Sequence, residues 1–208
     1  FKTGRVRVSL SPNPFSKGKT FRQVMDLQTG SVQIEADGVK LRIWADANHP
    51  VYHVEINSPN KIIVTAEPEF WERFDSCGFN NFDVTDENEQ SQISSKPTQD
   101  VRIERNGNIF WYYAVDDKSV YKDDMEYYDV EEMISKLPDP YAYNTFGNLL
   151  ESHDLKLKDG ALSGAGNQFD IRIHSLSKQT PDPESWMEEI ENKAQEPLNV
   201  AEDWSQHC

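Results

Sequence analysis

Alternating apolar and polar side chains run through the first seventy residues, and this pattern constrains the fold more than any other feature. In RVRVSL, residues 5–10, every second side chain is apolar, which is the period of a strand with one buried face. Turn formers separate the successive runs, among them Asp37-Gly38 and Ser58-Pro59-Asn60. The other runs span residues 21–27, 32–34, 39–43, 52–56 and 61–67. Because no helical period intervenes, the pattern predicts an antiparallel meander of five or six strands.

The middle of the chain loses this pattern and then recovers it. Residues 82–100 are polar and have no period, which predicts a long excursion between sheets. The run VRIERNGNIFWYYAV at 101–115 predicts a hairpin, because Asn106-Gly107 suits a type I′ turn. Further short strands with glycine turns are expected within 143–177.

Two helical segments are expected toward the C-terminus. An acidic stretch leads into weak helical potential at 130–137, which Pro138 stops. Asp182 is the predicted N-cap of a second helix, with Pro183 at its first position and Trp186 and Ile190 on one face. The chain is therefore predicted to be all-β and antiparallel, with a few helices near the C-terminus.

Net charge and cysteine content exclude several classes of function. With 21 Lys and Arg against 36 Asp and Glu, the formal charge is −15, which disfavours nucleic acid and anionic lipid as partners. No apolar run is long enough for a transmembrane helix. Cys77 and Cys208 cannot form a disulfide framework or a CxxC metal site. The chain opens with Phe1 rather than Met, so we expect an upstream segment to have been removed.

The histidine pair in LRIWADANHPVYHVEI, residues 41–56, is the nearest approach to a chemical motif. His49 and His53 are four apart, but Pro50 between them forbids the helix that would bring them onto one metal. In an extended chain they would be roughly 13 Å apart, too far for shared bonds of about 2 Å. We therefore interpret Asp46, Asn48 and Pro50 as a corner between two strands.

Three aromatic side chains are candidates for stacking against sugars. Trp44 alternates with the apolar positions around it and is expected on the face away from their core, where it would line either a second interface or a glycan surface. Trp111 and Tyr113 lie in a strand that is apolar on both faces, which favours burial on both sides over a sugar-stacking platform. Trp44, Trp111 and Tyr113 are the predicted carbohydrate-binding residues.

No residue is predicted to be catalytic or to bind a metal or cofactor. The chain has no GxSxG, no glycine-rich phosphate loop and no Cys/His nucleophile pair. The acidic residues between 116 and 126 lack the spacing of a calcium loop, so a solvated loop is the favoured interpretation.

Several segments together resemble the N-terminal domain of bacterial glycoside hydrolases related to the α-L-fucosidase group. The matching segments are SLSPNPF at 9–15, FRQVMDLQTGSVQI at 21–34, LRIWADANHPVYHVEI at 41–56, NTFGNLL at 144–150 and IHSLSKQTPDPESWMEEI at 173–190. The resemblance implies a large antiparallel, mutarotase-like β-super-sandwich over residues 1–197. The closing VAEDWSQHC is similar to the start of the helical linker that leads to an (α/α)₆ barrel, so residues 198–208 are expected to begin that linker.

The resemblance implies a non-catalytic domain that packs on the barrel of the same polypeptide and helps to shape its substrate pocket. The catalytic acid and base of these enzymes belong to the barrel, so no role transfers to a residue here. A periplasmic or extracellular location is implied as well. Two alternatives stay open: an autonomous carbohydrate-binding module, and an enzyme with mutarotase-like chemistry using His53, His153 or His174.

Overall fold

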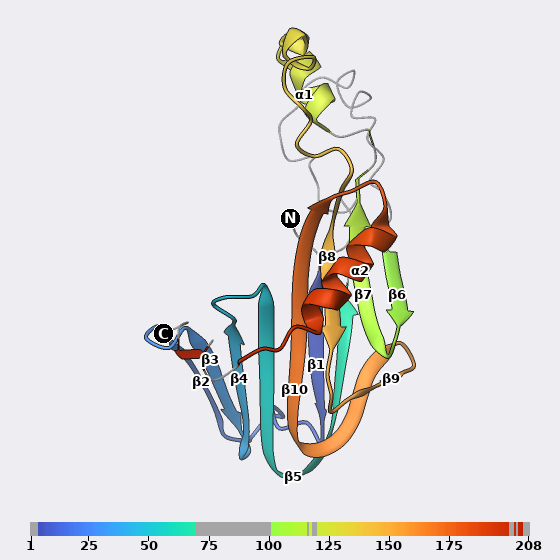
Figure 1. Ribbon diagram of the computed structural model, residues 1–208. Helices are drawn as coiled ribbons and strands as arrows, with labels where there is room; N and C mark the ends of the chain where they lie inside the picture. The colour runs from blue at the N-terminus through green and yellow to red at the C-terminus, as the bar shows by residue number, and fades with distance from the viewer. Residues whose placement is uncertain are drawn as a thin grey trace.

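The computed structural model describes residues 4–69, 101–115, 117, 120–199, 202 and 204–205. Within them the chain forms ten strands, two α-helices and one short 3₁₀ helix (Figure 1). The strands are β1 Arg5–Ser11, β2 Phe21–Asp26, β3 Ser31–Ala36, β4 Val39–Ala45, β5 Val51–Glu69, β6 Val101–Arg105, β7 Asn108–Ala114, β8 Asn144–Glu151, β9 Lys156–Lys158 and β10 Ala161–Gln179. The helices are α1 Val120–Tyr127, η2 Glu131–Met133 and α2 Pro183–Ala194. The predicted all-β class is confirmed.

All strand pairs in the sheet are antiparallel, and their order along the main path is β2-β3-β4-β5-β10-β8-β7-β6. The predicted meander is confirmed for β2 to β5, which are neighbours in chain order. The first strand departs from it, because β1 pairs with the second half of β5. Asp37-Gly38 closes the β3–β4 hairpin with positive φ at both residues, as a type I′ turn requires.

The expected turn at Ser58-Pro59-Asn60 is wrong, and so is the expectation that the strands after residue 144 are all short. Both β5 and β10 run for 19 residues, and β10 pairs with both halves of β5. Between the two paired halves the register shifts, so that residues 57–62 of β5 lie opposite residues 166–168 of β10. Pro59, which has no N–H to donate, falls within this irregularity, where a ladder bond is not needed.

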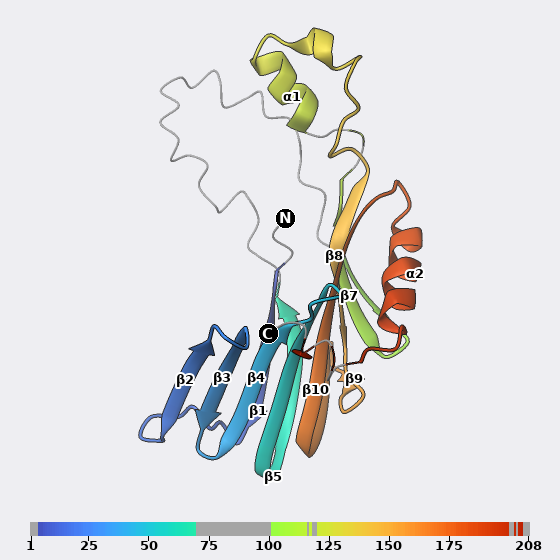
Figure 2. The ribbon, with the colours of Figure 1, turned by 60° about the vertical axis from the view of Figure 1, so that its left-hand side comes forward.

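The bend in β5 and β10 folds the sheet into two layers around one core (Figure 2). Val54 and Ile56 from the first half of β5 pack in the same cluster as Ile62 and Val64 from the second half. The core also takes apolar side chains from β1, β4, β7, β8 and β10. The two long strands are therefore shared by both layers, and the architecture is a β-sandwich.

A second apolar cluster holds α2 against the opposite, outer face of the sheet. Trp186, Met187 and Ile190 of the helix pack on Phe110 of β7 and Leu149 of β8. The helix begins as the sequence predicts, with the Asp182 carboxylate accepting a hydrogen bond from the Glu184 N–H and Pro183 at the first position. The strand at 109–115 is thus covered on both faces, as its pattern predicted.

The connections differ from the sequence prediction in one place. The hairpin at Asn106-Gly107 is confirmed, with positive φ at both residues. In the acidic stretch the helix begins at Val120, earlier than the expected 130–137, and only the short η2 occupies that expected span. This segment projects beyond the ends of β7 and β8 (Figures 1 and 2). The predicted excursion at 82–100 lies outside the described residues.

Candidate functional site on the outer sheet face

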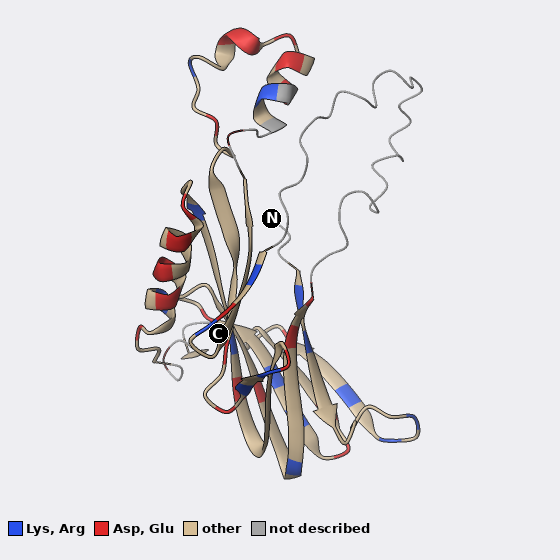
Figure 3. Ribbon diagram, turned by 90° about the vertical axis from the view of Figure 1, so that its right-hand side faces the viewer, with Lys and Arg blue, Asp and Glu red and all other residues tan. Residues whose placement is uncertain are grey.

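The outer face of the sheet carries a band of charged and aromatic side chains beside α2. Strand alternation places Arg42 and Trp44 of β4, His53 and Glu55 of β5 and Asp170 of β10 on this face, opposite the core positions Val54, Ile56 and Ile171. Cross-strand pairing brings Trp44 opposite His53 and Arg42 opposite Glu55. Charged strand positions also stand out on the ribbon of Figure 3. These five residues form the outer-face site.

On one side of the outer-face site, Arg42 is surrounded by ionic and aromatic contacts. The Arg42 guanidinium donates to both carboxylate oxygens of Glu55 at 2.6–2.9 Å. Glu55 also accepts a hydrogen bond of 2.9 Å from the Trp44 indole N–H. Trp204, from the segment after α2, lies over Arg42 with 4.4 Å from the guanidinium carbon to the ring centroid, and meets Trp44 edge-on at 5.1 Å. Arg42 is held by ion pair and cation–π contact at once.

Of the two alternatives left open for Trp44, the structure shows a covered interface and not an exposed glycan surface. Its side chain is 2% exposed, because the His53 ring stacks on it at 4.1 Å and 6° and Trp204 closes its edge. Alternation along β4 correctly assigns Trp44 to the face away from the core. What alternation does not reveal is that a segment 160 positions later in the chain covers that face.

The other two predicted carbohydrate-binding residues lie on a different part of the sheet. Trp111 is buried in the main core, on the inner face of β7. Tyr113 is half-buried, and its ring packs on Phe146 of β8 at 5.2 Å. The structure does not bring Trp44 together with Trp111 and Tyr113, and the two buried tryptophans present no ring face to solvent.

His53 lies between two carboxylates at the centre of the outer-face site. Its Nε2 is 3.9 Å from Asp46 Oδ2, and its Nδ1 is 3.7 Å from Asp170 Oδ1. Both distances are longer than a hydrogen bond, so these are electrostatic contacts. His53 Nε2, Asp46 Oδ2 and Asp170 Oδ1 are buried atoms without a hydrogen-bond partner. His53 and the two aspartates therefore bring together three unsatisfied polar atoms from residues up to 124 positions apart in the sequence.

The other carboxylate oxygen of Asp46 and that of Asp170 both accept hydrogen bonds. Asp46 Oδ1 accepts hydrogen bonds from the backbone N–H groups of Asn48 and His49 and lies 3.2 Å from the His49 ring, which confirms the strand corner expected there. Asp170 Oδ2 accepts from Arg172 at 2.8 Å. Burial raises the pKa of Asp46, but the hydrogen bonds from Asn48 and His49 outweigh it and leave that pKa below its usual value. Burial likewise raises the pKa of Asp170, and His53 and Arg172 outweigh it.

These lowered pKa values predict a loss of stability in acid. A carboxyl with a lowered folded-state pKa binds protons more weakly when folded, so the unfolded chain takes up more protons as the pH falls. The stabilising contribution is complete above the ordinary value of 3.8 and is lost as the pH falls through the lower, folded-state pKa. Asp170→Asn is expected to reduce the difference in unfolding free energy between about pH 6 and about pH 3, as measured by urea denaturation. An unchanged pH dependence in this variant would contradict the assignment.

The remaining histidines named in the sequence analysis have separate surroundings. His174 of β10 is buried on the outer face, and its Nε2 is 2.9 Å from Glu151 of β8. His153 is exposed in the connection that follows β8. Glu151 also lies 3.8 Å from Arg172, which extends the charged band toward α2. Within the described ranges no three His, Cys, Asp or Glu side chains gather as a metal site, and Cys77 and Cys208 lie outside those ranges.

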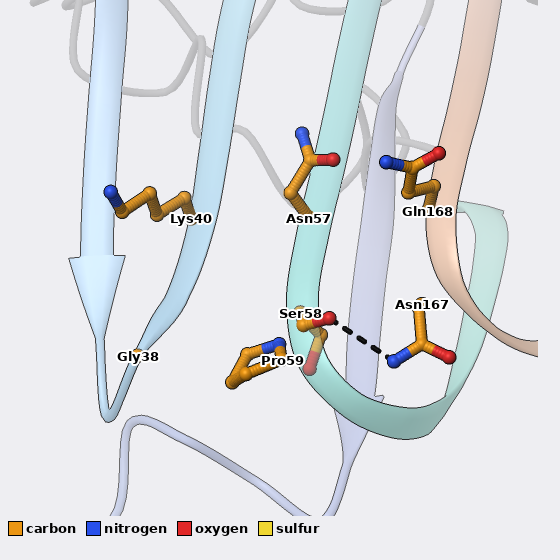
Figure 4. Close-up of a pocket in the computed structure, with 7 residues that line it drawn as sticks. All are labelled: Gly38, Lys40, Asn57, Ser58, Pro59, Asn167 and Gln168. Carbon is orange, nitrogen blue, oxygen red and sulfur yellow. Dashed lines mark hydrogen bonds between the residues drawn. The ribbon is translucent and has the colours of Figure 1, made fainter.

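Two hollows open on the outer face beside this band. One, of about 550 Å³, is lined by Gly38, Lys40, Asn57, Ser58, Pro59, Asn167 and Gln168 (Figure 4). The other, of about 600 Å³, is lined by Arg22, Val24, Gln33, Ile34, Glu35, Lys40, Leu41, Arg42, Glu55 and Asn57. They share Lys40 and Asn57, and the second reaches Arg42 and Glu55 of the outer-face site.

Sequence reasoning missed Asp170, Trp204 and the side chains of the hollows. One signal was available: Gln168, Asp170 and Arg172 alternate with Phe169 and Ile171, which marks a strand with one polar face. Nothing local connects that polar face to β4 and β5, because the pairing joins residues more than a hundred positions apart.

Comparison with known proteins assigns the chain to a family. No helix among the described residues is both long enough and apolar enough to cross a membrane. A search of curated proteins found no match. Residues 1–208 match the N-terminal sequence model of a family described as a domain of unknown function, DUF5703. Because this match extends over the whole sequence, the chain belongs to the DUF5703 family, in its N-terminal domain.

Proposed function

We propose that this chain is a non-catalytic docking module of a larger glycoside hydrolase. In this proposal it packs on an (α/α)₆ barrel carried by the same polypeptide and helps to shape the barrel's substrate pocket. The proposal includes a periplasmic or extracellular location, inferred from the sequence resemblance described above. The observation that carries it is an uncovered apolar surface at the β2 end of the sheet.

This surface, the apolar edge face, consists of Phe15, Phe21, Met25 and Leu27. Phe21 and Met25 pair with Ala36 and Val32 of β3, so they extend the core side of the sheet past the last strand that the second layer covers. The four side chains are 41%, 59%, 68% and 86% exposed in chain order. Phe15 meets Phe21 edge-on at 6.2 Å, so two of the four already form one aromatic pair. Several exposed apolar side chains at one edge of a sheet are typical of protein–protein contacts.

The course of the chain after α2 supports a barrel as the partner. The segment leaves α2, crosses the outer face and brings Trp204 onto Arg42 and Trp44 of β4, two strands from the sheet edge. A domain that continues the chain would start near the same end of the sheet, on the face opposite the apolar edge face, and would reach it around β2. The family match is to an N-terminal domain, which is also what such an arrangement requires.

The burial of two candidate histidines supports a non-catalytic role. A general acid or base must approach the reacting atoms. His53 is 1% exposed and lies under Trp44, and His174 is 3% exposed and paired with Glu151. Mutarotase-like chemistry would need imidazoles open to a sugar, and of the three candidate histidines only His153 is exposed, so this alternative is the less supported one.

Enzyme assays with aryl glycosides test the proposal. The 208-residue chain is expected to show no turnover above buffer. The full polypeptide is expected to hydrolyse at least one aryl glycoside, with the activity residing in the part that follows this domain. Turnover by the 208-residue chain at enzymatic rates would contradict the proposal, as would a full polypeptide that contains no helical barrel.

A further inference from the structure

Five polar side chains form a straight row across five neighbouring strands of the outer face. Arg22 of β2 pairs with Glu35 of β3, and Glu35 with Lys40 of β4. Lys40 pairs with Asn57 of β5, and Asn57 with Gln168 of β10. Four strand spacings of about 4.8 Å make this polar row about 19 Å long.

The side chains of the polar row do not bind one another. Among the described residues, none of these five side chains forms a hydrogen bond or ion pair with another. The adjacent row behaves differently, because Arg42 and Glu55 bind each other there. Members of the polar row therefore keep their donors and acceptors available, although they are close in sequence to residues that are fully engaged.

Two hollows border the polar row. Lys40 and Asn57 line both of them, so the middle of the row is common to the two hollows. In Figure 4, Asn57 and Gln168 lie side by side at the upper part of the first hollow, above Ser58 and Asn167. The Asn167 amide donates to the Ser58 carbonyl at 3.1 Å and joins the strands at this end. The floor is therefore built on hydrogen-bonded strands.

The chemistry of the polar row selects the class of ligand. Its members alternate between donors at Arg22 and Lys40, an acceptor at Glu35, and amides that do both at Asn57 and Gln168. Hydroxyl groups also donate and accept, so a polyhydroxylated ligand can satisfy all of them. An anionic ligand would meet the Glu35 carboxylate in a chain of net charge −15. Trp204, half-buried over Arg42, supplies a flat apolar ring beside the second hollow.

We propose that the polar row and its two hollows bind a neutral oligosaccharide. The inference rests on the proposed function in one respect, that the glycan is a substrate of the parent enzyme. It relocates glycan contact from Trp44, Trp111 and Tyr113 to Lys40, Asn57 and Gln168. The aromatic contribution then comes from Trp204.

Screening the 208-residue chain against immobilised neutral and uronate-containing oligosaccharides tests the inference, with isothermal titration calorimetry on the neutral oligosaccharide that is retained best. Binding of a neutral oligosaccharide is expected. The double variant Asn57→Ala/Gln168→Ala is expected to weaken it about tenfold or more, because two hydrogen-bonding side chains are removed. Gln23→Ala, an exposed glutamine on the opposite face of β2, is the matched control and is expected to bind as the wild type does.

Three outcomes would overturn the inference: no oligosaccharide is retained, only acidic oligosaccharides are retained, or the double variant with a wild-type circular dichroism spectrum binds undiminished. Its failure is separable from that of the proposed function. Glycan binding is measured on the 208-residue chain alone, whereas the docking role depends on the aryl glycoside assays and on association with the barrel.

Discussion

Replacing Gly147 with alanine is expected to lower the free energy of unfolding by about 3 kcal/mol or more. Gly147 is in β8, opposite Tyr112 of β7. A Cβ at this position would lie 2.3 Å from the carbonyl oxygen of Trp111 and 2.5 Å from the Cα of Tyr112. These are backbone atoms of a paired strand, so the clash can be relieved only by separating β7 from β8. Urea denaturation followed by tryptophan fluorescence measures the loss.

Gly107→Ala is the matched control. Gly107 is in the β6–β7 turn with φ +82°, and its added Cβ would meet nothing within 4 Å. The cost there is the backbone preference alone, about 1–2 kcal/mol. If Gly147→Ala is no less stable than Gly107→Ala, the close packing of β7 on β8 described above is wrong.

Trp186→Ala is expected to destabilise the protein by about 3–5 kcal/mol. The indole is fully buried, packs on Tyr112 at 5.3 Å, and donates its N–H to the Leu176 carbonyl at 3.1 Å. It attaches α2 to the sheet, and a free helix of 12 residues is marginal in water. The measurement is again urea denaturation, with circular dichroism at the helical band reporting the loss of α2.

A conservative variant separates packing from hydrogen bonding. Trp186→Phe keeps an aromatic ring in the cluster but leaves the Leu176 carbonyl without its donor, so about 1–3 kcal/mol should be lost. A loss below about 1 kcal/mol in Trp186→Ala would show that α2 is not held by this contact. The segment leading to Trp204 would then need another anchor.

Local features of the fold were predictable because their causes are local. Asp37-Gly38 and Asn106-Gly107 form hairpins because the residues at these positions tolerate positive φ. Asp182 caps α2 because its short carboxylate reaches the Glu184 N–H. The apolar run at 109–115 is covered by the core on one face and by α2 on the other, as a strand apolar on both faces requires.

Features that depend on distant pairing were not predictable. Ser58-Pro59-Asn60 has the composition of a turn. Because β10 pairs with both halves of β5, these residues form a bend within one long strand instead. Alternation places Trp44 on the face away from the core but does not reveal that Trp204 and His53 cover it. In both cases the segment responsible is more than a hundred residues away in the sequence: β10 for the bend, and Trp204 for the burial of Trp44. The juxtaposition of Asp46, His53 and Asp170 belongs to the same class.

We propose that the apolar edge face attaches this domain to a barrel of the same polypeptide. The most direct test of this docking is calorimetric measurement of the affinity between the 208-residue chain and the proposed barrel domain, produced separately. Phe21→Asp and Met25→Asp are each expected to weaken association by about thirtyfold, the effect of losing roughly 2 kcal/mol at a buried contact. Ile63→Asp, a half-exposed apolar position on β5, is the control and should bind as the wild type does. If the two parts bind equally well with and without the aspartates, or do not bind at all, the apolar edge face is not the docking surface.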